Sequence, residues 1–306
     1  MNRPATYPLW QRLYDDVRFA SRSYRKQLAL SNPEEAIRLH YRHICKRPLD
    51  LDNPSLMTEW IQWLKLYGDT SRWTELSDKY AVRDYVAAQG FSSHLNELYA
   101  ACDEPSDLPW DTLPDAFILK PNNGCHSNII VEDKQNANRP QITQTLQKAL
   151  REPFGLTTAE FHYRNIQPKV VAERLLHQPD NPYGLTDYKV YCIGGKARAI
   201  LTCEPTGSKT PVKTLWSTDW QAVSDYNPRP LRQEELLPRP TALPELLSAA
   251  ETLAQPFPLV RIDYYIIDNQ PIFGEMTFTP AGGYRPYGTD LFLQEMGLLL
   301  TQTILS

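Results

Sequence analysis

The sequence predicts an α+β fold built from more than one structural unit. Helical patterns fill the first ninety or so residues, whereas strand-like runs and turns begin near residue 116 and then alternate with helices. A helical segment followed by hairpins mixed with helices is typical of α+β proteins rather than of a doubly wound parallel sheet. The 306 residues suffice for one large domain or a few small ones.

Composition places the chain among folded globular proteins. Hydrophobic residues make up 42% of the chain and charged residues 22%, which suits a protein with an ample core. The net charge of −4 argues against a basic surface that wraps nucleic acid, so we expect no nucleic-acid partner. No apolar run is long enough for a membrane span, and the start lacks the apolar stretch of a signal peptide.

Cysteine usage indicates a reducing compartment. The chain has 5 cysteines, and none of them forms a Cys-x-x-Cys pair. Free thiols are the simplest interpretation, and we expect no zinc cluster. We therefore expect a cytoplasmic protein.

Four helices are expected in the N-terminal region. The cap signal Ser31-Asn32-Pro33 precedes the second helix, and Gly90 follows the fourth, where a left-handed residue is needed. Apolar residues recur at helical spacing in the third. The expected ranges are 12–30, 34–45, 55–67 and 74–89.

Strands and two further helices are expected in the rest of the chain. Short apolar runs bounded by turns predict strands, and a stripe of apolar residues from Leu243 to Leu253 predicts an amphipathic helix. Residues 204–240, rich in Pro, Thr and Trp, are expected to be irregular. The expected strands are 116–120, 128–131, 169–176, 187–193, 197–202, 260–267 and 271–279, and the helices are 241–254 and 291–303.

The most informative stretch is a predicted hairpin. Asp268-Asn269-Gln270 is a turn signal between two strand-like runs. A three-residue loop places Asp263 directly opposite Glu275. Because side chains alternate along a strand, one face would be polar and the other would belong to the core. The polar face would carry Arg261, Asp263, Tyr265, Phe273, Glu275 and Thr277, and the core face Ile262, Tyr264, Ile266, Ile272, Met276 and Phe278.

Two opposed carboxylates in this hairpin suggest a metal site. Like charges directly opposite each other destabilise a strand pair, so something must offset the repulsion between Asp263 and Glu275. A divalent cation is one solution, since Mg²⁺ prefers one or two carboxylates together with phosphate oxygens and water. The alternative is a solvated sheet face on which Arg261 neutralises one acid. A one-residue slip of the register would move every side chain to the other face.

Other residues suit a phosphate ligand. Lys120 ends an apolar strand beside the polar turn that contains Gly124, where a lysine and loop amides can meet phosphate oxygens. Asp187 and Lys189 share a strand face and suit ribose and phosphate, although an ion pair across the sheet explains them equally well. The amides of Gly282-Gly283 could face a developing oxyanion, or the pair could form an ordinary turn.

In their order and spacing these segments resemble the TupA-like (teichuronopeptide biosynthesis) family of ATP-grasp ligases. The resemblance is carried by residues 55–67, 76–86, 113–131, 163–176, 187–197 and 260–283. It implies an ATP-grasp fold with a helical N-terminal region (1–90), a lid subdomain (91–176) with Lys120 and the Gly124 loop, and a C-terminal catalytic subdomain (177–306) with a mixed or antiparallel sheet.

The resemblance also implies roles for individual residues. Two positions depart from the family pattern: Thr277 stands where many ATP-grasp enzymes have Asn, and the loop after Lys120 has one glycine where two are common. The implied ATP-binding residues are Lys79, Lys120, Gly124, Glu173, Leu175, Asp187 and Lys189; the metal ligands are Asp263, Glu275 and Thr277; the catalytic residues are Arg261, Gly282 and Gly283; and Arg285 would contact substrate.

The implied activity is that of an ATP- and Mg²⁺-dependent carboxylate–amine ligase. A substrate carboxylate would form an acyl phosphate, which an amine would then attack, with no protein nucleophile. A closing lid would exclude water. The family context suggests small-molecule partners, with an amino acid or similar amine joined to a uronic-acid or polysaccharide carboxylate in cell-surface polysaccharide synthesis.

Two other functions compete with ligation. A glycosyltransferase would use a nucleotide sugar and an Asp-x-Asp metal motif, for which Asp50-Leu51-Asp52 is the attractive match. A non-catalytic ATP-grasp-like scaffold is the other. Separately, the basic N-terminal segment with Arg18, Arg22 and Arg25 could bind an anionic glycan, or it could be a solvated helix packed on the body.

Overall fold

The computed structural model describes residues 9–125, 127–152 and 154–305. The helices are α1 (Leu9–Ala20), α2 (Arg22–Ser31), α3 (Pro33–Cys45), α4 (Met57–Tyr67), α5 (Trp73–Ser77), α6 (Val82–Ala88), α7 (Arg139–Arg151), α8 (Leu243–Ala254) and α9 (Asp290–Leu305). The strands are β1 (Leu98–Cys102), β2 (Phe117–Pro121), β3 (Ile129–Val131), β4 (Val170–Arg174), β5 (Asp187–Ile193), β6 (Lys196–Glu204), β7 (Val212–Trp216), β8 (Leu259–Ile267) and β9 (Gln270–Thr277). Among these helices, none combines the length and hydrophobicity that crossing a bilayer requires.

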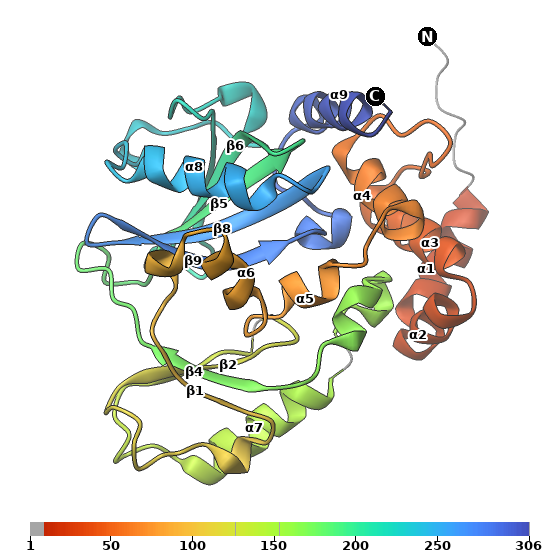
Figure 1. Ribbon diagram of the computed structural model, residues 1–306. Coiled ribbons are helices and arrows are strands. Elements are labelled where there is room, and N and C mark those ends of the chain that lie inside the picture. The colour runs from red at the N-terminus through yellow and green to blue at the C-terminus, as the bar shows by residue number, and fades with distance from the viewer. Residues whose placement is uncertain (1–8, 126, 153, 306) are drawn as a thin grey trace.

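Two antiparallel sheets form the body of the molecule. One has the strand order β1-β4-β2-β3 and the other β7-β6-β5-β8-β9. Figure 1 shows α8 and α9 above the five-stranded sheet, α7 below the four-stranded sheet, and α5 and α6 between the two. The α+β prediction is therefore confirmed, and all strand pairs in both sheets are antiparallel.

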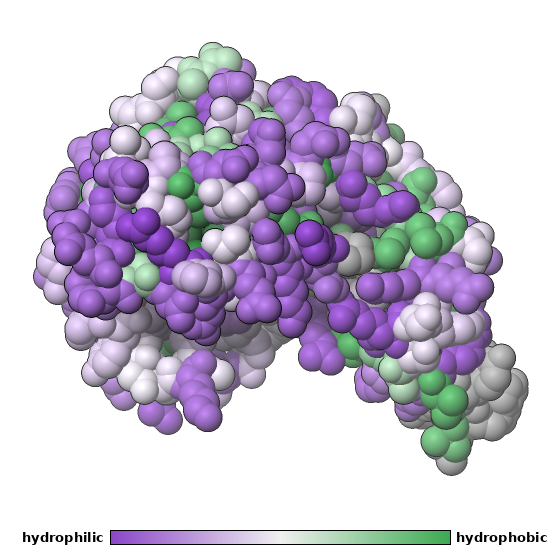
Figure 2. Space-filling model, turned by 90° about the horizontal axis from the view of Figure 1, so that it is seen from below, coloured by the Kyte–Doolittle hydropathy of each residue, from purple (hydrophilic) through white to green (hydrophobic). Residues whose placement is uncertain are grey.

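Helices α1 to α4 form the N-terminal region at one side of the body (Figure 1). The predicted single helix over 12–30 is wrong, because α1 and α2 are separate. Ser21 lies between them, and its hydroxyl caps α2 by accepting a hydrogen bond from the Tyr24 amide at 3.2 Å. Seen from below, the surface is largely hydrophilic and is hollowed between the body and this helical region (Figure 2).

A second predicted helix, over 74–89, is also broken. Residues 78–81 interrupt it between α5 and α6, and Asp78 stabilises this turn by accepting a hydrogen bond from the Tyr80 amide at 2.8 Å. Lys79 therefore lies in a turn rather than on a helix. Gly90 has a φ of +90° just beyond α6, as predicted.

Three elements were not predicted. Strand β1 lies at the edge of the four-stranded sheet, and β7 falls within 204–240, which was expected to be irregular. Helix α7 has a recognisable start, since the Asn138 side chain accepts a hydrogen bond from the Gln141 amide and Pro140 occupies the first turn. The cap and the proline were the available signals for this helix.

Each sheet packs one face on helices and turns the other toward the opposite sheet. In the five-stranded sheet, Val190 and Ile262 are fully buried in one cluster with Leu246 and Leu253 of α8. Because side chains alternate along β5 and β8, the neighbouring Lys189 and Asp263 point the other way. The polar face of this sheet therefore lines the space between the two sheets.

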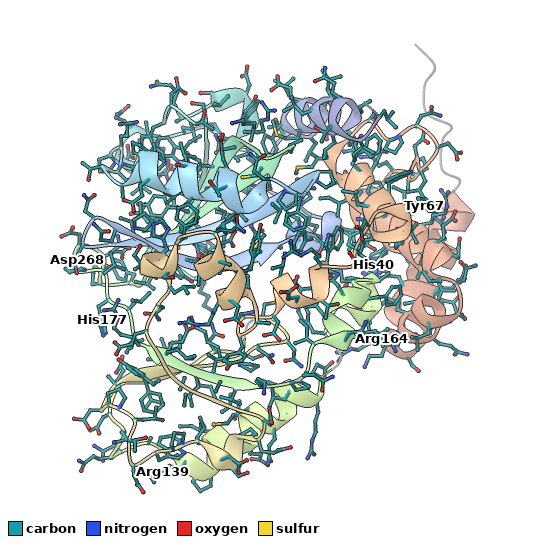
Figure 3. The ribbon with its side chains drawn as sticks, viewed as in Figure 1. His40, Tyr67, Arg139, Arg164, His177 and Asp268 are labelled. Atoms are coloured by element: carbon teal, nitrogen blue, oxygen red, sulfur yellow. The ribbon has the colours of Figure 1, made fainter. Side chains whose placement is uncertain are left out.

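The β8–β9 hairpin differs from the predicted hairpin in two ways, and the two differences have opposite effects on the strand register. The three-residue loop is a wrong prediction: only Asp268 (φ 49°) and Asn269 (φ 62°) connect the strands, in the left-handed region typical of tight two-residue hairpin turns. A two-residue loop alone would shift the register by one residue. A bulge at Gly274 restores it, so that Asp263 still pairs with Glu275. Figure 3 shows Asp268 at the tip of the hairpin.

The bulge also changes which residues share a face. Phe273 pairs with Tyr264, and their rings lie 6.0 Å apart in the core cluster. Phe273 therefore does not belong to the polar face, contrary to the prediction. Between the bulge and the hairpin turn, the register differs by one residue from the predicted one. The β9 residues in that stretch therefore point to the opposite face of the sheet from the predicted face.

The close approach of the two strands at Gly274 leads to a first prediction. A Cβ at this position would lie 3.1 Å from the Asp263 carbonyl oxygen. We expect Gly274→Val to lower the free energy of unfolding by about 1–3 kcal/mol through overpacking. Urea denaturation measures this. Asp268→Gly in the same hairpin keeps the turn, since Asp268 has a φ of 49°, and should leave the midpoint nearly unchanged. An unchanged midpoint in Gly274→Val would contradict the prediction.

Candidate active site

Two adjoining cavities lie between the sheets. The smaller has a volume of about 160 Å³ and the larger about 590 Å³, and both are lined by Lys79, Lys189 and Glu275. The smaller is also lined by Arg83, Lys120, Glu173, Asp187 and Asp263. The larger is also lined by Ser77, Gly124, Glu160, Arg261, Thr277 and Thr279. The structure thus brings together most of the site residues predicted from the sequence.

Asp263 is the most enclosed acid of the site. Its side chain is 4% exposed and is held by two cations. Arg261 donates from Nε to Oδ1 at 2.6 Å and from Nη2 to Oδ2 at 2.7 Å, and Lys189 Nζ lies 2.7 Å from Oδ2. Burial alone would raise the pKa of Asp263, but the charges of Arg261 and Lys189 outweigh it and hold the pKa below its ordinary value.

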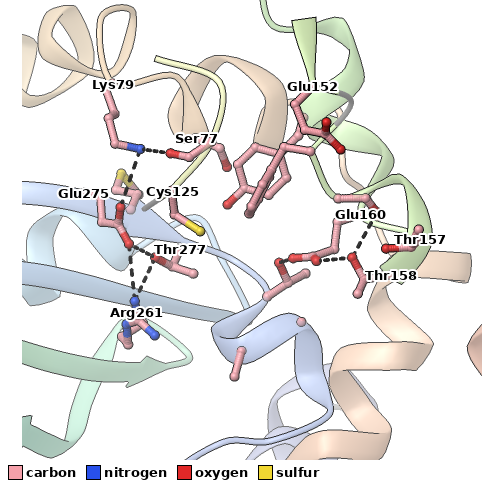
Figure 4. Close-up of a pocket in the computed structure, with 18 of the residues that line it drawn as sticks. Ser77, Lys79, Cys125, Glu152, Thr157, Thr158, Glu160, Arg261, Glu275 and Thr277 are labelled. Atoms are coloured by element: carbon pink, nitrogen blue, oxygen red, sulfur yellow. Dashed lines mark hydrogen bonds and ion pairs between the residues drawn. The ribbon is translucent and has the colours of Figure 1, made fainter. Parts of the chain in front are cut away.

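Glu275 faces Asp263 across the hairpin and shares Arg261 with it. Arg261 Nη2 lies 3.3 Å from Glu275 Oε1, and the Thr277 hydroxyl donates to the same oxygen at 2.9 Å (Figure 4). Lys79 Nζ is 3.8 Å from the other oxygen. Arg261 therefore offsets the repulsion between the two carboxylates. The alternative to a metal ion that the sequence left open was a solvated face on which Arg261 neutralises one acid, whereas here Arg261 contacts both acids and Asp263 is buried.

Asp187 and Lys189 extend the charged face onto β5. Lys189 pairs with Asp263 across the β5–β8 ladder and also lies 3.3 Å from Asp187 Oδ2. Burial alone would lower the pKa of Lys189, but Asp263 raises it above its ordinary value. Burial raises the pKa of Asp187, against the opposing charge of Lys189. The lysine is therefore firmly charged.

The four-stranded sheet contributes the opposite wall of the smaller cavity. Lys120 Nζ, from β2, lies 2.7 Å from Glu173 Oε2 on the adjacent β4. Arg83, from α6, donates to the other Glu173 oxygen at 3.1 Å. The sequence interpretation missed Arg83, although it stands four residues after Lys79 and is basic like it.

Lys79 connects the two sheets. Its Nζ donates to the Gly124 carbonyl in the β2–β3 loop at 2.5 Å and approaches Glu275 on β9. The Asp78 side chain stabilises the turn that presents it and also accepts a hydrogen bond from Asn122 at 2.9 Å. The break between α5 and α6 therefore places this lysine at the junction of the two cavities.

Several predicted residues lie elsewhere. Leu175 and Gly283 line neither cavity, and Arg285 is exposed outside them. Gly282 lines the larger cavity, but its amide donates to the Thr279 carbonyl at 2.7 Å, which matches the ordinary turn that the sequence left open beside an oxyanion contact. Gly283 instead permits close packing, because a side chain there would collide with Gln62. Of these four residues, only Gly282 lines either cavity, so Leu175, Gly283 and Arg285 lie apart from the residues that the structure brings together.

The competing motifs have local structural roles. Asp50 accepts hydrogen bonds from the amides of Asp52 and Asn53, as in an Asx turn, and lines neither cavity. In the basic N-terminal segment, Arg25 donates to the Phe19 carbonyl at 2.7 Å. Arg22 alone of the three basic residues singled out there lines the larger cavity, where it pairs with Glu152.

The buried pairing of Asp263 leads to a second prediction. Asp263→Asn leaves Arg261 and Lys189 without their shared counter-charge, so we expect the free energy of unfolding to fall by about 3–5 kcal/mol near neutral pH. Glu275→Gln is the milder comparison, because this side chain is 35% exposed.

The effect of Asp263→Asn should depend on pH. A carboxylate whose folded-state pKa is depressed stabilises the fold fully above its unfolded-state pKa of about 3.9 and loses that contribution as the pH falls through the folded-state value. The stability difference between wild type and variant should therefore shrink in strongly acidic solution. Urea denaturation at about pH 7 and about pH 3 measures it; a constant difference would contradict the assigned charge state.

Comparison with known proteins places the chain in a family. No curated protein sequence matches it. A solved D-alanine–D-alanine ligase from Bacillus anthracis in complex with ATP is similar at a TM-score of 0.43 and 14% identity, covering 75% of this chain. The alignment covers 64% of that ligase, so this chain spans about two thirds of its length. D-alanine–D-alanine ligase from Helicobacter pylori (TM-score 0.44, 14% identity, 84% of this chain and 70% of the ligase) is also similar.

A third similar structure is the D-cycloserine synthetase DcsG, at a TM-score of 0.42 and 13% identity, covering 90% of this chain and 80% of the synthetase. The family model described as TupA-like ATPgrasp matches residues 59–300, which include both sheets. The range also includes the charged centre, which we define as Lys79, Lys189, Arg261, Asp263 and Glu275. The chain belongs to the TupA-like ATP-grasp family.

Proposed function

We propose that this protein is an ATP-dependent carboxylate–amine ligase that works through an acyl phosphate. The observation that carries the proposal is the pairing of Asp263 with Glu275 under one guanidinium, Arg261, between two sheets that both present lysines. Family membership supports the ATP dependence. Both cavities meet at this centre, so a nucleotide in one and a second substrate in the other would share it.

The smaller cavity is the proposed site for the ribose and phosphates of the nucleotide. Its volume of about 160 Å³ is smaller than a whole ATP molecule needs, so the rest of ATP would extend beyond it. Lys79, Lys120 and Lys189 supply cations for phosphate oxygens, and Asp187 supplies a carboxylate for ribose hydroxyls. Each of these cations now has an acidic partner, so phosphate would replace one set of charge-assisted bonds with another. Lys120, for example, would exchange Glu173 for a phosphate oxygen.

The acids of the centre fit a magnesium ion. Within the described residues, no group of three or more acidic, histidine or cysteine side chains could hold a metal alone. One or two carboxylates with phosphate oxygens and water is the usual environment of Mg²⁺, and Asp263, Glu275 and the Thr277 hydroxyl would supply the protein oxygens. Bound there, the ion would neutralise phosphate charge.

The proposed reaction has two steps. A carboxylate oxygen attacks the γ-phosphorus of ATP, and ADP leaves. The amine, after losing its ammonium proton, attacks the acyl carbon; the C–O bond to phosphate breaks, phosphate leaves with the bonding electrons, and the nitrogen releases a second proton. Arg261 would hold the negative oxygens of the acyl phosphate in place. The unit formed by residues 91–176, which includes the Gly124 loop, would act as the lid that excludes water.

We assign the substrates by class. The resemblance to teichuronopeptide-biosynthesis enzymes supports a uronic-acid carboxylate and an amino acid or similar amine, in cell-surface polysaccharide synthesis. The volume of the larger cavity, about 590 Å³, is in the range of small-molecule sites. A nucleotide-sugar reaction finds less support, because Asp50 and Asp52 line neither cavity.

Nucleotide preference tests the proposal directly. We expect Mg²⁺-dependent binding of ATP and no binding of nucleotide sugars, as measured by isothermal titration calorimetry. ADP release should then require both a carboxylic acid and an amine from a panel of uronic acids and amino acids. Binding of a nucleotide sugar in place of ATP would favour a glycosyltransferase, and ATP binding without any turnover would favour a scaffold.

Single substitutions test the lysine side and the carboxylate side of the nucleotide site separately. Lys120→Met should weaken ATP binding at least about tenfold through the loss of a charge-assisted contact, whereas Lys148→Met, an exposed lysine on α7, should not change it. Glu275→Gln should weaken the Mg²⁺ dependence of ATP binding and lower turnover. Calorimetry with and without Mg²⁺ measures the changes in ATP binding in both variants. If Lys120→Met bound ATP as tightly as wild type does, this lysine would not belong to the nucleotide site.

A further inference from the structure

The larger cavity contains a buried acid that the proposed reaction leaves without a role. Glu160 is 7% exposed and lies between two short 3₁₀ helices, η3 (Leu156–Thr158) and η4 (Phe161–Asn165). Its carboxylate lines the cavity across from Lys79, Arg261 and Glu275 (Figure 4). Nothing in the sequence analysis singled it out.

Only neutral groups donate to this carboxylate among the described residues. The Thr279 hydroxyl donates to Oε1 at 2.5 Å and the Thr158 hydroxyl to Oε2 at 2.5 Å. A carboxylate offers about four acceptor positions, so two remain unused. These positions are open to a ligand in the cavity.

A nearby lysine does not supply the missing partner. Lys65 lies behind the cavity wall, and its ammonium donates to Gln62 at 2.9 Å and to the carbonyls of Thr158 and Gly282 at 3.0 and 2.6 Å. These three bonds use all three of its hydrogens. Burial lowers the pKa of Lys65 to about 8, against the opposing charge of Glu160. Within the described chain, Glu160 makes no ion pair, and a buried carboxylate without one is costly.

A second polar group in the cavity also lacks a partner. Ser77 is 7% exposed, and its buried hydroxyl has no hydrogen-bond partner within the described residues. Buried polar groups are nearly always satisfied by protein, water or ligand. Ser77 lines the same cavity as Glu160, so it is a second, independent sign that a polar ligand binds there.

The acid is aligned with the charged centre. Thr277 bonds to Glu275, and Thr279, two residues further along, bonds to Glu160. Strand β9 ends at Thr277 and Thr279 follows it in a bend, so both threonines lie at the same end of this strand. The larger cavity therefore has Arg261 at one end, where Asp263 and Glu275 balance its charge, and at the other end Glu160, which has no ion-pair partner among the described residues. A second carboxylate would be repelled at the Glu160 end, whereas a cation would be stabilised there.

We propose that Glu160 binds the ammonium group of the amine substrate and that the acceptor is therefore an amine that is protonated in solution. This inference rests on the proposed ligation. With the ammonium on Glu160 and the acyl phosphate at Arg261, the amine and the acyl carbon would occupy the same cavity. The first of the two protons that the nitrogen loses passes to the Glu160 carboxylate, and the second passes to the departing phosphate.

Binding of small probes tests the site without knowledge of the full substrate. The probes are glycinamide, which carries an ammonium group, and glycolamide, its neutral counterpart with a hydroxyl. Each is titrated by NMR into the full chain saturated with Mg²⁺ and a non-hydrolysable ATP analogue. We expect wild type to bind glycinamide in preference to glycolamide, and Glu160→Gln to weaken glycinamide binding at least about tenfold.

Controls separate this proposal from the broader one. Glu132→Gln removes the same charge from an exposed position and should bind glycinamide like wild type. Unchanged affinity for the ATP analogue in Glu160→Gln shows that the variant is folded. If wild type fails to bind the ATP analogue, the ligase proposal fails, and the amine titration without nucleotide still tests Glu160.

Three results would overturn the proposal: equal affinity for the two probes, no binding of glycinamide, or unchanged glycinamide affinity in Glu160→Gln. If Glu160→Gln does not fold, a crystal structure of wild type with glycinamide decides. An ammonium nitrogen within hydrogen-bond distance of the Glu160 carboxylate supports the assignment, and one bound elsewhere overturns it.

Discussion

Arg261 holds together two carboxylates that would otherwise repel each other. It makes two hydrogen bonds to Asp263 and a third contact to Glu275, and the site around it is largely shielded from water. Charges interact more strongly in such surroundings than in water. Removing one partner therefore leaves the other charges unpaired, which lowers the stability of the fold. Lys189 adds a second cation to Asp263. The β8–β9 hairpin, the adjacent strand β5 and the space between the sheets all depend on the positive and negative charges of this cluster offsetting one another.

The same balance explains how the site could accept a nucleotide. The cations that face the smaller cavity are each paired with an acid, as Lys120 is with Glu173 and Lys79 is with Glu275. An incoming polyanion would compete for lysines whose geometry is already set by these contacts, which lowers the cost of ordering them. Because the lysines come from different units of the chain, a bound phosphate group would also draw the two sheets together.

The sequence predicted contacts in the site correctly where residue type and position along a strand both limited the possible arrangements. The pairing of Asp263 with Glu275 was predicted correctly, but for an incomplete reason, since the loop is one residue shorter than assumed and the bulge at Gly274 makes up the difference. A bulge leaves little trace in a single sequence other than a glycine, which has many other uses. Residues selected only by proximity to a motif, such as Arg285, do not line the cavities.

The amino-acid sequence by itself determined the fold class and the pairing of Asp263 with Glu275, because strand alternation and residue chemistry are local properties. The family and the interest of Lys79 came from the resemblance of the segments to known ATP-grasp proteins. Only the tertiary structure decided that Lys79 sits in a turn between two helices and that Glu160 lies in line with Glu275. Glu160 is far from β9 along the chain, and no periodicity or spacing relates the two. Their proximity follows from how the N-terminal helices, the two sheets and the connecting 3₁₀ turns pack, and packing depends on all of these surfaces at once.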